Sequence, residues 1–432
     1  MAMEKTKMDA YVKILQEELV LAMGCTEPIA IAYAAALARK HLGMLPESVD
    51  IRVSSNIIKN VKSVVVPHTG GLRGIDAAAA AGVVVGDADQ ELEVLSAVPE
   101  ERVPEIAAFL NRGIIHVAPT EGSCIFDIRI RVSAGEHSAA VRIAGAHTNV
   151  VYLEEDGKVL LDREYHDGKQ ADQTDHSILN VEDIVEFADT VDVERIRPTL
   201  DRQISCNMAI AEEGLKGSWG ANVGSVLLNA YGDSVHNRAK AMAAAGSDAR
   251  MSGCELPVVI NSGSGNQGLT ASVPVIVYAR DMGVSDEKMY RALAVSNLVT
   301  IHLKTGIGRL SAYCGATSAG CGAGAGIMYL KGGTASDIAH TVVNAVAINS
   351  GMICDGAKAS CAAKIASAVE AGLLGMQMRL QGEQFYGGDG IVTKGVENTI
   401  DNVGRVARYG MAETDKEIIQ IMVSDKTDRS ET

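Results

Sequence analysis

The spacing of apolar and polar positions changes twice along the chain, which predicts three parts. Residues 4–23 carry apolar side chains at helical spacing, and Gly24 suits the end of that helix. A second helix is predicted directly after Cys25, because Thr26–Pro28 supplies an N-cap, an acidic first turn and a proline at the helix start. Both N-terminal helices are expected to pack with the later helical part.

From about residue 49 to residue 155 the apolar positions follow a strand-like pattern. Strands are predicted at Ile51–Ser54, Val61–Val66, Ile114–Ala118, Cys124–Val132, Ser138–Ile143 and Asn149–Leu153. Helices are predicted between them at Gly74–Val85, Asp89–Leu95 and residues 101–111. Residues 154–178 are polar and rich in turn signals, which indicates a hairpin and a linker. This part reads as a smaller α+β domain with a largely antiparallel sheet.

Helical periods dominate from residue 180 to the end. A chain of 432 residues exceeds the usual size of a single core, so two domains are expected. The predicted fold class is α+β, with a large, mainly α-helical catalytic domain and a smaller inserted α+β domain. The expected divisions are residues 1–47 for the N-terminal helices, 48–174 for the smaller domain and 175–432 for the helical domain.

Composition narrows the classes of partner and location. The chain has 44 glycines and is only 4% aromatic, which suits closely packed helices that also offer a face for a homodimer. The net charge of −15 is spread without long runs, so neither nucleic acid nor an acidic membrane surface is an expected partner. The N-terminus lacks the apolar core of a signal peptide, which predicts a cytoplasmic protein. The uncharged stretch 310–330 is interrupted by glycines and makes a poor membrane span.

Half of the eight cysteines lie between residues 309 and 364, in two Cys-x6-Cys pairs: Cys314 with Cys321 and Cys354 with Cys361. In a reducing compartment such cysteines suggest a metal or catalysis before disulfides. Thiolates bind soft metals and iron–sulfur clusters, and we interpret the set as cluster ligands. The spacing alone is weakly specific. Four buried free thiols and a structural zinc site that uses all four are the alternatives.

Cys25 lies just ahead of a predicted helix, where the dipole favours a thiolate and lowers the thiol pKa. The alternative is a small buried apolar residue.

A second candidate is the Gly-Ser stretch from Asn261 to Thr270, in which backbone amides are free to point at an anion such as a carboxylate or phosphate. It does not match a P-loop, and the alternative is a flexible loop.

Two tight polar loops each place a histidine beside a threonine at a strand end, where sites are often built. The first contains His68 and Thr69, and the second contains His147, Thr148 and Asn149. The alternative is a turn in which the histidine hydrogen-bonds locally.

Several motifs together resemble the L-cysteine desulfidase family, which is related to the alpha chain of iron–sulfur-dependent L-serine dehydratases. The resemblance covers nearly the whole chain and rests on Gly24–Pro28, Ser247–Met251, Ser262–Gly268 and Gly351–Ala357 with Cys361. It implies an oxygen-sensitive 4Fe-4S cluster held by Cys314, Cys354 and Cys361, with one iron open to substrate. It also implies that Cys321 is not a ligand and that Cys25 is the general base.

The function implied is an iron–sulfur β-elimination lyase, an L-cysteine desulfidase that forms pyruvate, ammonia and hydrogen sulfide in L-cysteine catabolism, with L-serine as a further substrate. We expect the small amino-acid substrate to place its carboxylate on the amides of Ser264, Gly265 and Asn266. The further substrate-binding candidates are His68, Thr69, His147, Thr148 and Asn149. The alternative is a non-enzymatic amino-acid-binding or redox-sensing protein with structural cysteines.

Overall fold

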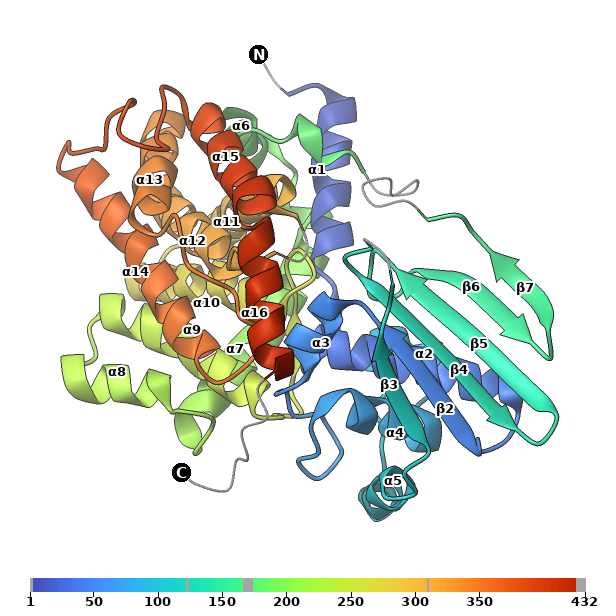
Figure 1. Cartoon of the computed structure of the whole chain (residues 1–432). Helices are drawn as coiled ribbons and strands as arrows, with labels where there is room; N and C mark the ends of the chain where they lie inside the picture. The colour runs from blue at the N-terminus through green and yellow to red at the C-terminus, as the bar shows by residue number, and fades with distance from the viewer. Residues whose placement is uncertain (1–2, 122–123, 166–173, 309–310, 425–432) are drawn as a thin grey trace.

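The computed structural model describes residues 3–121, 124–165, 174–308 and 311–424. A large helical part and a smaller part built on a twisted sheet lie side by side, with α1 along their border (Figure 1). The α+β fold class is therefore confirmed. Each part has its own large apolar core.

The sheet of the smaller part has six strands in the order β3-β2-β4-β5-β6-β7. Only the β2–β3 pair is parallel, so the prediction of a largely antiparallel sheet is confirmed. Apolar residues alternate with polar ones along β2 and β4, as expected for a sheet with one buried face. The strands are β2 (Ser48–Val53), β3 (Ile115–Pro119), β4 (Asp127–Ala134), β5 (His137–Ala144), β6 (Val150–Glu155) and β7 (Lys158–Asp162).

The buried face of the sheet shares its core with α2 (Thr26–Leu42), α3 (Ser55–Val61), α4 (Gly74–Val85) and α5 (Val103–Leu110). This differs from the expectation that α2 packs with the helical part. Helix α2 is apolar on almost every face, so its hydrophobic pattern could not select the layer in which it is buried. It crosses α4 closely, since a side chain at Gly82 would meet the Ala32 carbonyl oxygen at 2.1 Å.

The helical part is joined by α1, and the chain returns to it after β7. Its central helix, α12, packs against α10, α11, α13 and α14, which enclose it with small and β-branched side chains. The helices are α1 (Lys5–Glu18), α6 (Val181–Thr190), α7 (Arg197–Lys216), α8 (Val223–Tyr231), α9 (Val235–Met251), α10 (Gly265–Met282), α11 (Asp286–Ile307), α12 (Gly315–Leu330), α13 (Ala335–Ile348), α14 (Cys361–Leu380), α15 (Val396–Arg405) and α16 (Ala412–Ser424).

Three short predicted segments differ in the structure. Helix α1 ends at Glu18, and Leu21–Met23 forms strand β1, which pairs with β8 (Pro257–Val259). The run Val61–Val66 is not a strand, because α3 ends at Val61 and the chain then turns. The predicted helix at residues 89–95 is a 3-10 helix, Ala88–Glu93. Short apolar runs do not distinguish helix from strand, and at Leu21–Met23 pairing with β8 decided the outcome.

The remaining short helices are 3-10 turns at Glu100–Arg102, His176–Ile178 and Val193–Arg195, and a π-helical turn at Val406–Gly410. Within the described ranges, no helix combines the length and the apolar character that crossing a bilayer requires.

Candidate active site

Cys314 and Cys354 are neighbours although 40 residues separate them. Cys314 is the N-cap of α12, and Cys354 lies in the loop between α13 and α14. The Cys314 amide donates to the Met352 carbonyl (2.9 Å) and the Cys354 amide donates to the Ala312 carbonyl (2.6 Å). This backbone pairing brings the two thiols within hydrogen-bond reach. The bond from Cys314 lowers the pKa of the Cys354 thiol and raises the pKa of the Cys314 thiol.

Cys361 is the first residue of α14, and its Sγ lies 3.8 Å from the Gly356 carbonyl oxygen. Burial raises the pKa of its thiol, and the nearby charge of Cys354 raises it further. The three predicted ligands are therefore brought together. Two of them stand at helix N-termini, where the helix dipole favours negative charge.

The three cysteines have the donor chemistry of iron–sulfur cluster ligands. Among the described residues, no group of three His, Cys, Asp or Glu side chains is arranged to hold one metal ion. Cys321, the fourth cysteine of the zinc alternative, is 1% exposed in the interior of α12 and belongs to the main apolar core. In a cluster each thiolate binds a different iron, so the sulfurs need not converge on one point, and three soft thiol donors have suitable chemistry.

Cys25 faces this centre from the smaller part. It is the N-cap of α2, is 2% exposed, and packs with Val64, Met251 and Cys361. Its Sγ donates to the Glu27 carboxylate at 3.3 Å. Burial raises the pKa of the Cys25 thiol and Glu27 raises it further, while the charge of Arg250 opposes them. The expected lowering by the helix N-terminus is not found, because burial and the carboxylate outweigh the dipole.

Glu27 holds the Cys25 turn in place. Its carboxylate also accepts hydrogen bonds from the Thr26 hydroxyl (3.0 Å) and from the Asn60 side-chain amide (3.2 Å). The Thr26 hydroxyl also lies 3.0 Å from the Gly263 carbonyl oxygen, and its one hydrogen can be donated to either this oxygen or Glu27. The N-terminal turn of α2 is thereby attached to the Gly-Ser stretch that the sequence singled out.

The Gly-Ser stretch forms a tight turn that starts α10. Ser262 and Gly263 have φ values of 50° and 80°, a left-handed conformation that glycine adopts without strain. Ser264 is the N-cap of α10 and makes no side-chain capping bond, so the first-turn amides of Gly265 and Asn266 point out of the helix end. A helix N-terminus of this kind binds anions.

Two residues to which the sequence analysis gave no role border this turn. Arg250, at the end of α9, is 2% exposed, and its Nη1 donates to Asn266 Oδ1 at 3.1 Å. Gln267, in the first turn of α10, is 5% exposed and lies against Gly315, next to Cys314. Both lie in motifs that carry the family resemblance, Arg250 in Ser247–Met251 and Gln267 in Ser262–Gly268, and that placement was the sequence signal for them.

The two histidine loops are placed differently. Pro67 packs on Gly24, so His68 lies beside the Cys25 turn, and its Nδ1 is 3.2 Å from Glu255 Oε1. The Thr69 hydroxyl donates to Val66 within its own turn (2.7 Å). His147 lies edge-on to the Phe126 ring, with 4.8 Å between centroids.

Other hydrogen bonds of the second loop close its own turn. The Asn149 side chain donates to the Ala144 carbonyl (2.8 Å), and the Val150 amide donates to the Thr148 carbonyl (3.0 Å). The structure thus places His68 beside the turn that carries Cys25, while these bonds place Thr148 and Asn149 in the turn between β5 and β6.

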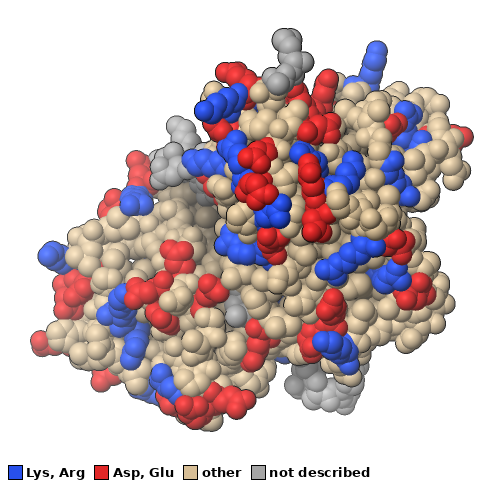
Figure 2. Space-filling model, turned by 180° about the vertical axis from the view of Figure 1, so that it is seen from behind, with Lys and Arg blue, Asp and Glu red and all other residues tan. Residues whose placement is uncertain are grey.

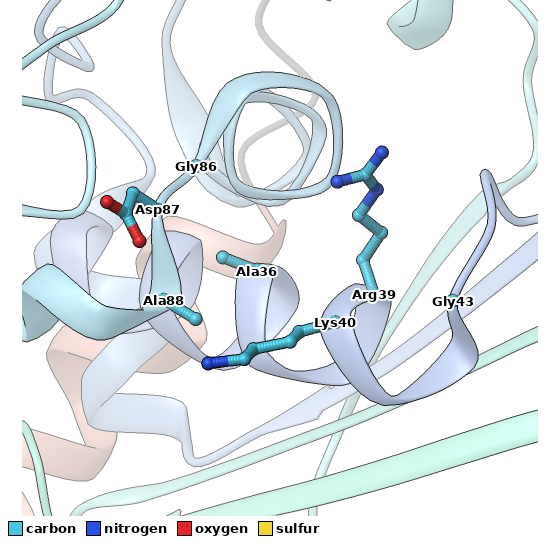
Figure 3. Close-up of a pocket in the computed structure, with 7 residues that line it drawn as sticks. All are labelled: Ala36, Arg39, Lys40, Gly43, Gly86, Asp87 and Ala88. Carbon is cyan, nitrogen blue, oxygen red and sulfur yellow. The ribbon is translucent and has the colours of Figure 1, made fainter.

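A separate pocket of about 330 Å³ opens at the other end of α2 (Figure 3). Arg39 lies on one side of it and Asp87 on the other, and the Lys40 side chain extends from α2 towards Ala88. Helix α2 has 17 residues, so at 1.5 Å per residue this pocket is roughly 20 Å from Cys25. Figure 2 shows acidic and basic side chains interspersed over one face of the molecule, without a broad area of one sign.

Residues 89–420 match the sequence profile described as serine dehydratase alpha chain. Curated relatives include UPF0597 proteins of Desulfitobacterium hafniense (58% identical over 96% of both chains) and of Lachnoclostridium phytofermentans (52% over 96% of this chain and 99% of the relative). A third, from Treponema denticola, is 46% identical over 98% of this chain and all of its own. The chain therefore belongs to the serine dehydratase alpha chain family, the group that includes L-cysteine desulfidases.

Proposed function

We propose that the chain is an iron–sulfur-dependent β-elimination lyase of the cytoplasm, most specifically an L-cysteine desulfidase that also accepts L-serine. The observation that carries this proposal is the meeting of Cys25 with Cys361, and hence with Cys314 and Cys354, beside the N-terminus of α10. Membership of the serine dehydratase alpha chain family supports the lyase class.

Cys314, Cys354 and Cys361 would hold the 4Fe-4S cluster. When bound, the cluster supplies a Lewis-acidic iron that stabilises the departing thiol or hydroxyl group. The chain itself binds and orients the rest of the substrate. The first-turn amides of α10, from Gly265 onward, receive the carboxylate.

Cys25 is the proposed base that removes the α-proton. In the free chain burial and Glu27 keep its thiol protonated, so the base must first lose that proton. The Glu27 carboxylate, 3.3 Å from the sulfur, is placed to accept it, and the charge of Arg250 stabilises the resulting thiolate. A thiolate with a raised pKa is a stronger base once formed.

Loss of the α-proton and of the β-thiol gives aminoacrylate and hydrogen sulfide. Aminoacrylate rearranges to an imine, and water converts the imine to pyruvate and ammonia. With L-serine, water leaves in place of hydrogen sulfide.

The two histidine loops stay predicted substrate-binding sites, with His68, Thr69, His147, Thr148 and Asn149. His68 is the best placed, because its Nε2 is buried beside the Cys25 turn without a hydrogen-bond partner.

The test is anaerobic purification of the chain, followed by iron and sulfide analysis and by assays for pyruvate and ammonia with L-cysteine and L-serine. We expect about four irons per chain, a brown colour and release of both products. A colourless chain that takes up no iron during reconstitution would contradict the proposal. Binding of amino acids without release of ammonia would favour the binding-protein alternative.

A further inference from the structure

Arg250 carries a buried charge for which the described part of the chain provides no acidic partner. Its residue is 2% exposed, its Nη1 bonds to the neutral Asn266 amide, and its Nε has no acceptor. An arginine stays charged at every physiological pH, and a buried charge is normally paired. Because no carboxylate of the described residues pairs with this guanidinium, it has room for an anion from outside the chain.

The second anion-binding element lies at the same place. Gly265 opens α10, and a side chain there would meet Arg250 Nε at 2.3 Å, so the guanidinium lies directly on the first turn of the helix. Helix α10 has 18 residues and no side-chain cap, which leaves its first amides without internal acceptors. A planar carboxylate fits between a guanidinium fork and such amides, because both present parallel N–H donors.

Gln267, on the neighbouring face of the same turn, offers a hydrogen-bond acceptor, whereas Arg250 offers donors. Its Oε1 is buried without a donor, and its side-chain amide contacts Gly315, which follows Cys314. A buried acceptor without a donor is costly, so this oxygen also calls for a group from outside. Residues 266 and 267 are about 100° apart around the helix, so one side chain turns to Arg250 and the other to the cysteine centre.

We propose that Arg250 and Gln267 are the residues that bind the two ends of the substrate α-amino acid: Arg250 the carboxylate and Gln267 the ammonium group. This inference rests on the proposed function, because it takes the substrate to be an α-amino acid. Cys25 packs with Met251, the neighbour of Arg250, and Cys314 directly precedes Gly315, which Gln267 contacts. The proposal therefore places the substrate Cα between Cys25 and Cys314.

The test measures binding of three small ligands to the anaerobically loaded full chain by calorimetry and ligand-observed NMR. L-Alanine has both groups but no leaving group, propionate lacks the amine, and L-alaninol lacks the carboxylate. Arg250→Gln should weaken L-alanine and propionate by about 10- to 100-fold and leave L-alaninol unchanged. Gln267→Leu should weaken L-alanine and L-alaninol and leave propionate unchanged.

The matched control is Arg238→Gln, on the same helix, where the arginine is paired with Asp233 and Asp281 at the surface. It should leave all three affinities at the wild-type value. Arg250→Lys keeps the charge but loses the planar fork, and it should weaken only the two carboxylate ligands. If Arg250→Gln does not fold, Arg250→Lys still tests the proposal.

The proposal is overturned where Arg250→Gln weakens all three ligands equally, where it weakens none, or where the wild-type chain does not bind L-alanine. A wild-type chain that binds L-alanine with this pattern but forms no pyruvate from L-cysteine or L-serine supports the two binding residues and contradicts the lyase. Iron analysis of every variant separates loss of the cluster from loss of binding.

Discussion

Cys354 and Cys25 have opposite electrostatic surroundings, and these suit different roles. Cys354 accepts a hydrogen bond from Cys314, faces the charge of Lys59 and lies near the Gly356 amide, all of which favour its thiolate. Cys25 is buried beside the Glu27 carboxylate, which favours its thiol. A ligand must be a thiolate to bind metal, whereas a base must hold a proton reversibly. The surroundings thus agree with Cys354 as a ligand and Cys25 as a base.

Serine substitutions at three cysteines should therefore give three different results. Cys354→Ser should abolish iron binding and colour, because a hydroxyl is a poor ligand for iron–sulfur clusters. Cys25→Ser should keep the iron and lose at least about 100-fold in turnover, the usual contribution of a general base. Cys321→Ser should keep both, since this residue lies in the apolar core. Iron analysis and pyruvate assays read the outcome, and full activity of Cys25→Ser would refute its role as base.

The sequence predicted the residue type of each candidate ligand but not the contacts around it. The cysteine spacing allowed a four-cysteine site, and only the resemblance left Cys321 out of the predicted ligands. Cys321 is 1% exposed inside α12. The raised pKa of Cys25 could not be predicted, because it depends on burial and on the rotamer of Glu27. The proximity of Arg250 to Asn266 and of Gln267 to Gly315 depends on how α9, α10 and α12 cross, which periodicity does not encode.

At the scale of elements, glycines set the distance between the two helices that begin at site cysteines. Gly320 on α12 lies over the Ala368 carbonyl of α14, and Gly372 on α14 lies over the Gly320 carbonyl, each within 2.2 Å of where a Cβ would stand. Helices that approach this closely cannot accept a side chain at the crossing. The crossing therefore fixes how far Cys314 and Cys361 are from each other.

Gly320→Val should force α12 and α14 apart. We expect the free energy of unfolding to fall by about 2–3 kcal/mol, as for other overpacked interiors, and the iron content to fall with it. Urea unfolding and iron analysis measure the two effects. Gly351→Ala is the matched control, because nothing lies within 4 Å of its Cβ position, and it should change neither quantity. Unchanged iron binding in Gly320→Val would contradict the link between the crossing and the site.

The start of α13 is stabilised by an ionised carboxylate. Asp337 completes a capping box with Thr334 and pairs with Arg379 of α14 (2.8 Å), and these contacts lower its pKa to about 2. A lowered pKa stabilises the fold at pH values above the unfolded pKa, and this stabilisation is lost as the pH falls through the folded pKa. The expected contribution is about 1–2 kcal/mol, because the pair is partly exposed to solvent.

Asp337→Asn should therefore lower the free energy of unfolding by about that amount at pH 7, with the difference from wild type shrinking between about pH 4 and pH 2. Urea unfolding at a series of pH values measures it. Thr334→Ser keeps the capping oxygen and should follow the wild-type curve. A difference that stays constant down to pH 2 would show that the carboxylate charge is not the cause.

Long elements were predictable where one period was clear, as in α11 and in the antiparallel strands β4 and β5. The prediction was wrong at Leu21–Met23, where pairing with Pro257–Val259 overrides a helical pattern. A three-residue strand that finds its partner more than 230 residues later leaves no local signal. That same pairing joins the strand before Cys25 to the strand before the Gly-Ser turn.

At the scale of the whole molecule, the C-terminal helix secures the smaller part against the cysteine centre. Figure 1 shows α16 reaching α3, and the Lys59 side chain of α3 forms an ion pair with Asp415 of α16. The Lys59 side chain is only 1% exposed, and a side chain at Gly356, in the Cys354 loop, would meet the Lys59 carbonyl at 2.3 Å. One residue thus connects the last helix, the smaller part and the loop that carries a predicted ligand.

Removing one partner of the buried Lys59–Asp415 pair should weaken the contact between the smaller part and the helical part. Asp415→Ala leaves Lys59 charged and unpaired, so we expect the free energy of unfolding to fall by about 3–5 kcal/mol. We also expect the buried Cys25 thiol to react faster with a thiol reagent, because the smaller part would separate more often from the centre. Glu417→Gln, an exposed site on the same helix, should match wild type in both measurements.

The double variant Lys59→Met with Asp415→Leu decides between charge and packing as the cause. Apolar residues of similar volume often replace a buried ion pair without loss of stability. The double variant should therefore recover most of the lost unfolding free energy and restore the slow reaction of Cys25. It should not restore the effect of Lys59 on Cys354, because the positive charge that favours the Cys354 thiolate is gone. Fast reaction of Cys25 in a double variant of wild-type stability would mean that the charge, and not the packing, keeps the two parts together.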